Sequence, residues 1–280
     1  MTHQVYITTS WDDGHPLDLR IADMLADNGL RGTFYIPLTS EHPTMTPAQI
    51  RQLCSAFDVG SHTLYHTDLS SATDAVVHAE LVDSKAWIED ISGRPCSSFC
   101  PPMGRFHRRH LPLIRNAGYS GIRTVECFSL DLPRSDSGLL IMPTTLQAHS
   151  HRPINYLKNA LRRFALRNLW LYIAYGTACS WDQAAHSLME YVLARGGVLH
   201  LWGHSWELQE TAQWTRLKTV LQMLGRFAID AIHLTNSELC SAALRHSAEP
   251  LCTIRASVPV TPLPIAATHP SSLHHPNLHA

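Results

Sequence analysis

Two short segments hold residue types that could form a metal site with one carboxylate to spare. Two adjacent acids, Asp12 and Asp13, follow an apolar run and precede a glycine. About fifty residues later, His62 and His66 are separated by three residues. On a helix or a tight turn, this spacing directs two imidazoles at one point, which suits a divalent cation at roughly 2.0–2.2 Å. Together the two segments predict metal-assisted hydrolysis.

The two aspartates are expected to have different roles. Consecutive side chains on an extended segment point to opposite sides, so Asp13 can face a metal while Asp12 faces an attacking water. We therefore predict Asp13, His62 and His66 as metal ligands and Asp12 as the general base. One aspartate could instead cap a helix that starts near Pro16, and a histidine pair at this spacing can arise by chance among 19 histidines. A cap, however, needs one aspartate and not two with a glycine.

The elements that must position these residues alternate over the first 125 residues. The pattern predicts strands at 5–9, 32–37, 58–62, 98–101 and 118–125, and helices at 17–28, 47–57, 72–91 and 109–117. Such alternation indicates parallel strands in an α/β barrel or a doubly wound sheet. Active sites on these folds gather at the carboxyl ends of the strands. All four predicted site residues lie at such ends.

The rest of the chain is less regular. Residues 126–153 show no pattern and are expected to be irregular loops, which would line the pocket. Helices are predicted at 155–175, 181–195 and 211–227, and strands at 198–202 and 231–234. From residue 247 the sequence is rich in proline and histidine and predicts disorder. We therefore expect one catalytic domain over residues 1–246 and a tail over 247–280.

Composition limits the classes of protein that the chain can belong to. It has 280 residues, of which 45% are hydrophobic, and a net charge of −1, so a large core is possible and a nucleic-acid partner is not indicated. No apolar run is long enough to cross a membrane. The first residues lack the pattern of a signal peptide, and seven cysteines are an odd number, so we expect a cytoplasmic protein with reduced thiols.

The two segments resemble known motifs. Thr9-Ser10-Trp11-Asp12-Asp13-Gly14 resembles the first motif of the polysaccharide deacetylases (carbohydrate esterase family 4, the nodulation-type deacetylase homology domain), and Ser61-His62-Thr63-Leu64-Tyr65-His66 resembles their second motif, His-Ser/Thr-x-x-x-His. The resemblance covers about residues 5–240. It implies a single-domain, distorted (β/α) barrel and hydrolytic removal of an N- or O-acyl group from a sugar. It also implies that Asp12 is the base and that Asp13, His62 and His66 bind the metal.

The third motif of the family departs from its usual form. Where the family has Arg-Pro-Pro-Tyr-Gly, this chain has Cys100-Pro101-Pro102-Met103-Gly104. The resemblance implies that the backbone N–H of Met103 binds the oxyanion, since a backbone donor survives a side-chain change. The missing arginine normally orients the catalytic aspartate, and Arg105 or Arg123 could replace it. The two prolines could also form no more than a rigid turn.

The late motifs are looser. We cannot place the fourth motif, an Asp-Trp pair, although Asp131 is a weak candidate. For the fifth motif, which supplies a histidine as general acid, we choose His204, because it follows a strand and lies between aromatic residues. His200 competes with it, but its place inside the strand favours a packed histidine.

Other residues are expected to contact the substrate. Trp202 and Trp206 could stack on a sugar ring or could seal the mouth of the barrel, and Arg123 and Pro102 are included among the predicted substrate-binding residues. Basic side chains on one predicted helix could hold an anionic substrate or form a solvated face: Lys158, Arg162, Arg163 and Arg167. Cys100 lacks a base partner, which argues against a thiolate nucleophile.

These observations predict a metal-dependent hydrolase that removes an acetyl or formyl group from the nitrogen of an amino sugar. Its substrate would be a small glycan, a nucleotide sugar or a glycolipid intermediate. Zinc is the first choice of ion, and cobalt, nickel and iron also suit two histidines and a carboxylate. One alternative is a C–N hydrolase of small cyclic amides, such as the allantoinase-like or imidase branches. Another is a degenerate carbohydrate-binding module. The sequence does not indicate the oligomeric state.

Overall fold

The structure is a computed structural model that describes residues 4–149, 165–176 and 180–248. Most of the predicted tail lies outside these residues, as do three of the four predicted basic helix residues, Lys158, Arg162 and Arg163. The predicted domain boundary at residue 246 therefore stays a prediction. No helix in the described part of the chain is long and apolar enough to span a membrane.

One sheet organises the molecule. Its strands are β1 (Val5–Asp12), β2 (Thr33–Ile36), β3 (Asp58–Ser61), β4 (Ser98–Phe99), β5 (Gly121–Arg123), β6 (Arg134–Asp136), β7 (Leu139–Met142), β8 (Leu146–Gln147), β9 (Gly197–Gly203) and β10 (Ile232–His233). The order is β6-β7-β5-β4-β3-β2-β1-β9-β8, and β10 pairs with β1. The strands pair in parallel except for β6 and β7.

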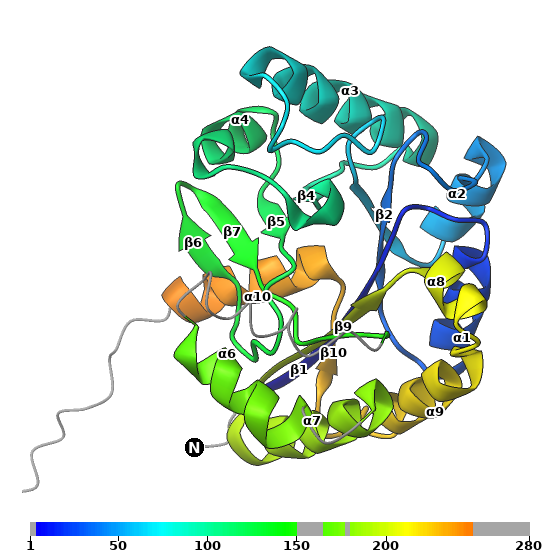
Figure 1. The fold of residues 1–280 in the computed structure, drawn as a ribbon, viewed down its shortest axis with the longest axis vertical. Coiled ribbons are helices and arrows are strands. Elements are labelled where there is room, and N and C mark those ends of the chain that lie inside the picture. The colour runs from blue at the N-terminus through cyan, green and yellow to red at the C-terminus, as the bar shows by residue number, and fades with distance from the viewer. Residues whose placement is uncertain (1–3, 150–164, 177–179, 249–280) are drawn as a thin grey trace, which may run out of the picture.

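A single extended segment joins the two ends of this strand order. β7 pairs with β5, while β8 pairs with β9 at the opposite end, and only residues 143–145 separate β7 from β8. Within this link, the backbone N–H of Thr145 donates to the backbone oxygen of His200 on β9 at 3.0 Å. The sheet therefore curls into a distorted barrel, as Figure 1 shows. The predicted single-domain α/β barrel is confirmed.

The region predicted as irregular, residues 126–153, contains three of these strands, so that prediction is wrong in part. Each strand has only two to four residues, too few for an alternating pattern to be recognised. β6 and β7 are connected by a tight turn in which Ser137 and Gly138 both have positive φ, at 54° and 78°. In the rest of the region, as far as residue 149, single backbone hydrogen bonds such as that from Phe128 to Thr145 hold the chain.

β1 is the central strand, and it fixes the position of the aspartate pair. All eight of its residues are buried. β9 pairs with it from Val5 to Trp11, while β10 and β2 share its other edge. Because all of its side chains are buried, the strand contains a short, uncharged, β-branched run, and this pattern allowed it to be predicted from the sequence. Its carboxyl end delivers Asp12 and Asp13.

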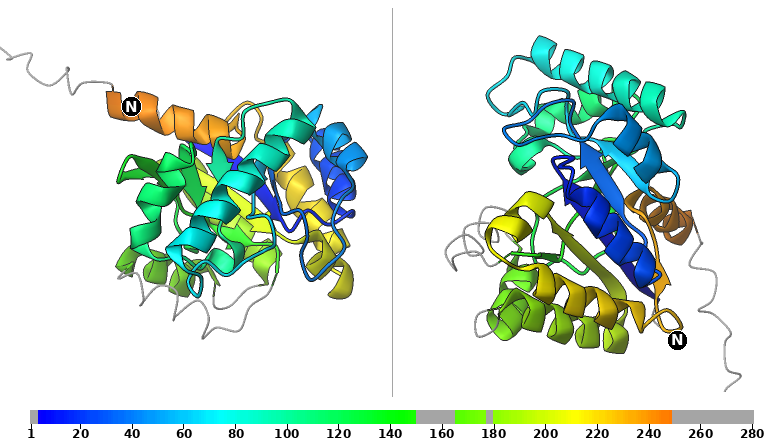
Figure 2. Two further views of the ribbon diagram at one scale, coloured as in Figure 1. Left: turned by 90° about the horizontal axis from the view of Figure 1, so that it is seen from above. Right: turned by 90° about the vertical axis from the view of Figure 1, so that its right-hand side faces the viewer.

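Helices cover the outside of the barrel (Figure 2). They are α1 (Asp18–Asp27), α2 (Pro47–Cys54), α3 (Asp74–Ser92), α4 (Leu111–Asn116), α6 (Leu166–Leu171), α7 (Trp181–Arg195), α8 (Ser205–Glu210), α9 (Trp214–Gly225) and α10 (Asn236–Ala248). A short π-helix at Tyr172–Gly176 follows α6. Local signals explain some starts: Thr46 caps α2 in a capping box with Gln49, and Pro47 occupies its first position.

Two helices were not predicted, and both have structural consequences. α8 is a short helix that starts directly after β9. α10 packs against buried side chains of three strands, Tyr6 on β1, Leu140 on β7 and Val198 on β9. Tyr6 lies near the start of β1, whereas Asp12 ends that strand. α10 therefore closes the amino end of the barrel and leaves the carboxyl end for the site.

Candidate active site

The aspartate pair at the end of β1 is held in an unusual backbone conformation. Asp13 has a φ of 73° and Gly14 a φ of 59°, both in the left-handed region. A Cβ on Gly14 would lie 2.6 Å from Cγ2 of Ile36, so only glycine fits there. The sharp turn separates the two carboxylates. Asp12 contacts Arg123, whereas Asp13 contacts two histidines.

Asp13, His62 and His66 converge on one point. Oδ1 of Asp13 lies 3.3 Å from Nε2 of His62 and 3.2 Å from Nε2 of His66. Neighbouring ligands of a tetrahedral ion are separated by about 3.4 Å when the bonds are near 2.1 Å. Oδ1 of Asp13 is buried and has no hydrogen-bond partner. The donor set and its spacing therefore fit a divalent cation.

The ionisation of this cluster suits metal binding. Burial tends to raise the pKa of Asp13, but the neighbouring rings of His62 and His66 and the charge of His204 hold it below its usual range. Asp13 is therefore a carboxylate. Nδ1 of His62 donates to the backbone oxygen of Cys100 at 2.7 Å. This bond fixes the tautomer and leaves the Nε2 lone pair facing Asp13.

The loop that carries His66 is ordered by Glu80, which was not predicted as a site residue. Glu80, on α3, is 7% exposed. Its carboxylate accepts from the backbone N–H of Leu64 at 2.7 Å and of Tyr65 at 3.2 Å, and from Oγ1 of Thr67 at 2.6 Å. The loop needs this support because His66 itself has a φ of 52°. A signal did exist: Glu80 interrupts the apolar, buried stripe of α3.

Asp12 pairs with Arg123, one of the two predicted replacements for the third-motif arginine. The guanidinium of Arg123 comes from β5, is fully buried and bonds Oδ1 of Asp12. Its centre lies 4.8 Å from the ring of Trp202 and 5.3 Å from that of Tyr35, so aromatic faces cover the buried charge. Arg105, the other candidate, forms an exposed pair with Asp68 instead.

Cys100 fills space beside this ion pair. Its Sγ lies 4.0 Å from Oδ2 of Asp12. Burial raises the pKa of the Cys100 thiol well above its usual value, so the group is a neutral thiol. This agrees with the absence of a base partner in the sequence. The guanidinium of Arg123 thus reaches Asp12 from the neighbouring strand, and a small side chain occupies the motif position.

The two late histidines lie in different environments. His204 precedes α8, and its Nε2 lies 3.9 Å from Oδ2 of Asp12 and 4.0 Å from Oδ2 of Asp13. His200 is buried inside β9, where its ring bonds Oγ of Ser10 at 2.9 Å and the backbone oxygen of Pro143 at 3.0 Å. Burial and the charge of Arg123 lower the pKa of His200 to about 3. His200 is thus a neutral, packed histidine.

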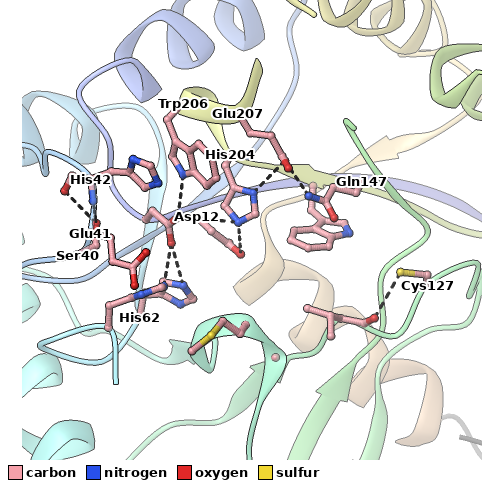
Figure 3. A pocket seen from close by; sticks show the side chains of 16 residues that line it. Asp12, Ser40, Glu41, His42, His62, Cys127, Gln147, His204, Trp206 and Glu207 are labelled. Atoms are coloured by element: carbon pink, nitrogen blue, oxygen red, sulfur yellow. Dashed lines mark hydrogen bonds and ion pairs between the residues drawn. The ribbon is translucent and has the colours of Figure 1, made fainter. Parts of the chain in front are cut away.

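The environment of His204 favours its charged form. Burial disfavours an imidazolium, but the hydrogen bond with Glu207 and the negative charges of Asp13 and Asp12 raise the pKa of His204 to about 8. Near neutral pH the group can therefore hold a proton for donation. Figure 3 shows His204 between Asp12 and Glu207.

A cavity of about 490 Å³ opens above these groups. It is lined by both aspartates, by His62, His66 and His204, and by Met103, whose φ is 56° and whose side chain is half-exposed. Of the other predicted substrate contacts, Trp202 and Trp206 also line it. Pro102 and Arg123 are buried and do not line it.

The two tryptophans are held by the protein itself. Nε1 of Trp206 donates to Oδ2 of Asp13 at 2.8 Å, and its ring stacks on His42 with the centroids 4.0 Å apart. Trp202 is 6% exposed and packs against Arg123. Both rings therefore support the charged residues of the site, and each keeps only part of its surface for a ligand.

Comparisons with known proteins agree with this geometry. The family model described as polysaccharide deacetylase matches residues 2–122, which include the first three motifs. No curated protein matches the sequence significantly. The resemblance to the polysaccharide deacetylases is confirmed.

Solved structures share the fold over most of the chain. A candidate polysaccharide deacetylase from Mycobacterium smegmatis superposes with a TM-score of 0.65 at 15% identity, over 88% of this chain and 92% of that chain. The chitin deacetylase of Colletotrichum lindemuthianum gives 0.54 at 15% identity, over 85% and 90%. A carbohydrate esterase family 4 pseudoenzyme of Bacillus anthracis gives 0.50 at 13% identity, over 86% and 66%. The fold therefore does not by itself establish activity.

The weak fourth-motif candidate does not join the site. Asp131 pairs with Arg167 and accepts from Oγ of Ser129, away from the residues that line the cavity. The carboxylate that contacts His204 belongs to Glu207, which the sequence analysis did not single out. Its signal was present in the short spacing His204-Ser205-Trp206-Glu207, but it has meaning only if a helix starts at residue 205.

Proposed function

We propose that this protein is a metal-dependent hydrolase that removes an acyl group, acetyl or formyl, from the nitrogen of an amino sugar. One observation carries the proposal. A metal-ligand cluster on one side of the cavity faces a carboxylate and a histidine on the other, and Oδ2 of Asp13 and Oδ2 of Asp12 lie about equally far from Nε2 of His204, at 4.0 and 3.9 Å. This arrangement can act on the attacking water and on the departing amine within one reaction.

Asp13, His62 and His66 would hold the cation. When bound, a divalent cation would supply Lewis-acid polarisation of the acyl carbonyl and of water. Zinc is our first choice, because two imidazoles and a carboxylate leave a fourth tetrahedral position open. Cobalt, nickel and iron(II) suit the same donors.

The chain's own residues would move the protons. Arg123 fixes Oδ1 of Asp12 and leaves Oδ2 to accept a proton from the attacking water as its oxygen bonds to the acyl carbon. The backbone N–H of Met103 would stabilise the oxyanion. His204 would then donate its Nε2 proton to the nitrogen as the C–N bond breaks. The products are a free amine and a carboxylic acid.

The size of the cavity bears on the substrate. A volume of about 490 Å³ falls in the range of small-molecule pockets and can hold a sugar ring with its acyl group and one neighbouring unit. This supports a small glycan, a nucleotide sugar or the head of a glycolipid. Biosynthetic intermediates in the cytoplasm are the source that we propose.

The test is an acid-release assay on protein that has been demetallated and reloaded with zinc or cobalt. N-acetylglucosamine oligomers, uridine diphosphate N-acetylglucosamine and N-formyl amino sugars are offered, and acetate or formate is detected by proton NMR. We expect release from at least one of them, and loss of release in Asp12→Asn, which keeps its metal. Binding of acylated sugars without any release would instead support a carbohydrate-binding module. Turnover of cyclic ureides alone would support the allantoinase-like alternative.

A further inference from the structure

We propose that Glu207 is a positioning residue for the proton donor His204, setting which ring nitrogen faces the substrate. The proposal rests on the proposed deacylase function. Oε2 of Glu207 lies 3.2 Å from Nδ1 of His204. Because a carboxylate can only accept, Nδ1 carries a proton, and the proton available for transfer sits on Nε2. Nε2 is the nitrogen that faces Asp12 and Asp13.

The start of α8 explains why the two side chains meet. His204 is the residue that precedes the helix, and Glu207 is its third helical residue. These two positions face each other across the first turn, as they do in a capping box. The contact is therefore fixed by local backbone geometry. A carboxylate at residue 206 or 208 would point elsewhere.

Glu207 is itself held from a second element. Nε2 of Gln147, on β8, donates to its Oε2 at 2.9 Å, and Nδ1 of His149 lies 3.5 Å from its Oε1. Burial tends to raise the pKa of Glu207, but the bond and charge of His204 and the charge of His149 lower it. The carboxylate is therefore ionised, and its side chain is 16% exposed. A group that is bonded from both sides has little freedom to turn away from His204.

This arrangement would act in one step of the reaction. As the acyl C–N bond breaks, the Nε2 proton passes to the departing nitrogen, and the ring becomes neutral with its proton on Nδ1. The hydrogen bond from Nδ1 to Glu207 can form both in the charged ring and in the neutral ring that results. Without Glu207 the ring could rotate or take the other tautomer, with no proton aimed at the substrate. The simpler alternative is that an acidic residue in the first turn only stabilises α8.

A positioning role for Glu207 and a purely stabilising role in α8 predict different results for substrates with different leaving groups. An amine must be protonated to leave, whereas 4-nitrophenolate leaves from 4-nitrophenyl acetate without a proton. In Glu207→Ala we expect kcat for the amide to fall by about 100-fold, within the range of general acid catalysis, and kcat for the ester to change less than about threefold. Metal content should not change. His204→Gln should show the same pattern, and the double variant should be no worse than either.

The matched control is Glu210→Ala, an exposed glutamate on the same helix, which should behave as the wild type. Equal losses on amide and ester, or no loss on the amide, would overturn the proposal. Failure of the wild type on every acylated substrate would reject the proposed function instead. A readout independent of turnover is the hydrogen-bonded Nδ1–H resonance of His204 by NMR. It should be present in the wild type and Glu210→Ala and absent in Glu207→Ala, and its persistence in Glu207→Ala would overturn the proposal.

Discussion

The metal-ligand side of the cavity and its proton-transfer side are built in different ways. The metal-ligand side consists of Asp13, His62 and His66. The proton-transfer side consists of Asp12, Arg123, His204 and Glu207. The first comes from two short motifs, while the second draws on β1, β5 and the turn into α8, and Arg123 is 111 positions after Asp12 in the sequence. A donor set can be encoded locally, but an acid and a base must be supported by whichever elements surround them.

The largest expected effect is on the metal-ligand side. His66→Ala removes a ligand whose Nε2 lies 3.2 Å from Asp13. Metal affinity should fall by more than the roughly 100-fold that loss of a supporting hydrogen bond causes. Hydrolysis of amide and ester should both fall to the level of the demetallated protein. Retained ester hydrolysis in this variant would contradict the assignment of metal binding to one side of the cavity and proton transfer to the other.

On the proton-transfer side, Arg123→Met should mainly affect the fold and the base. It leaves the buried Asp12 carboxylate without its partner, which typically costs about 3–5 kcal/mol in the free energy of unfolding. Urea denaturation measures this loss. Arg105→Met is the matched control, because its pair with Asp68 is exposed and should contribute less than about 1 kcal/mol. Similar losses in both variants would contradict the assignment of Arg123.

A smaller effect is expected from Glu80→Gln, which weakens the support of the loop that carries His66. Metal affinity should fall by about 10-fold, measured by competition with a chelating dye. Asp83→Asn, an exposed change on the same helix, serves as the control. If Glu80→Gln binds metal as the wild type does, the loop is held by other contacts.

The last effect is negligible near neutral pH and concerns stability in acid. The pKa of His200 is about 3 in the folded protein and near 6.5 in the unfolded chain, so between these values only the unfolded chain binds a proton there. Stability should therefore decline as the pH falls below 6.5, by up to about 1.4 kcal/mol per pH unit from this residue. His200→Gln should flatten the slope measured by urea denaturation at several pH values. An unchanged slope would show that His200 is charged in the fold.

The comparison also explains what the sequence could predict. The aspartate pair and the two histidines lie in contiguous motifs at strand ends, and the strands that carry them have clear patterns. The choice between Arg105 and Arg123 could not be made, because it depends on the pairing of β4 with β5. Glu207 acquires its role only from the turn of α8 after His204. β6, β7 and β8 were missed because strands of two to four residues leave no period to detect.

Metal titration of the demetallated protein tests the central claim most directly. The wild type should bind one zinc ion per chain by isothermal titration calorimetry, and Asp13→Ala should bind none with comparable affinity, because it removes the carboxylate between the two imidazoles. Equal zinc binding by both proteins would show that these three side chains do not share an ion.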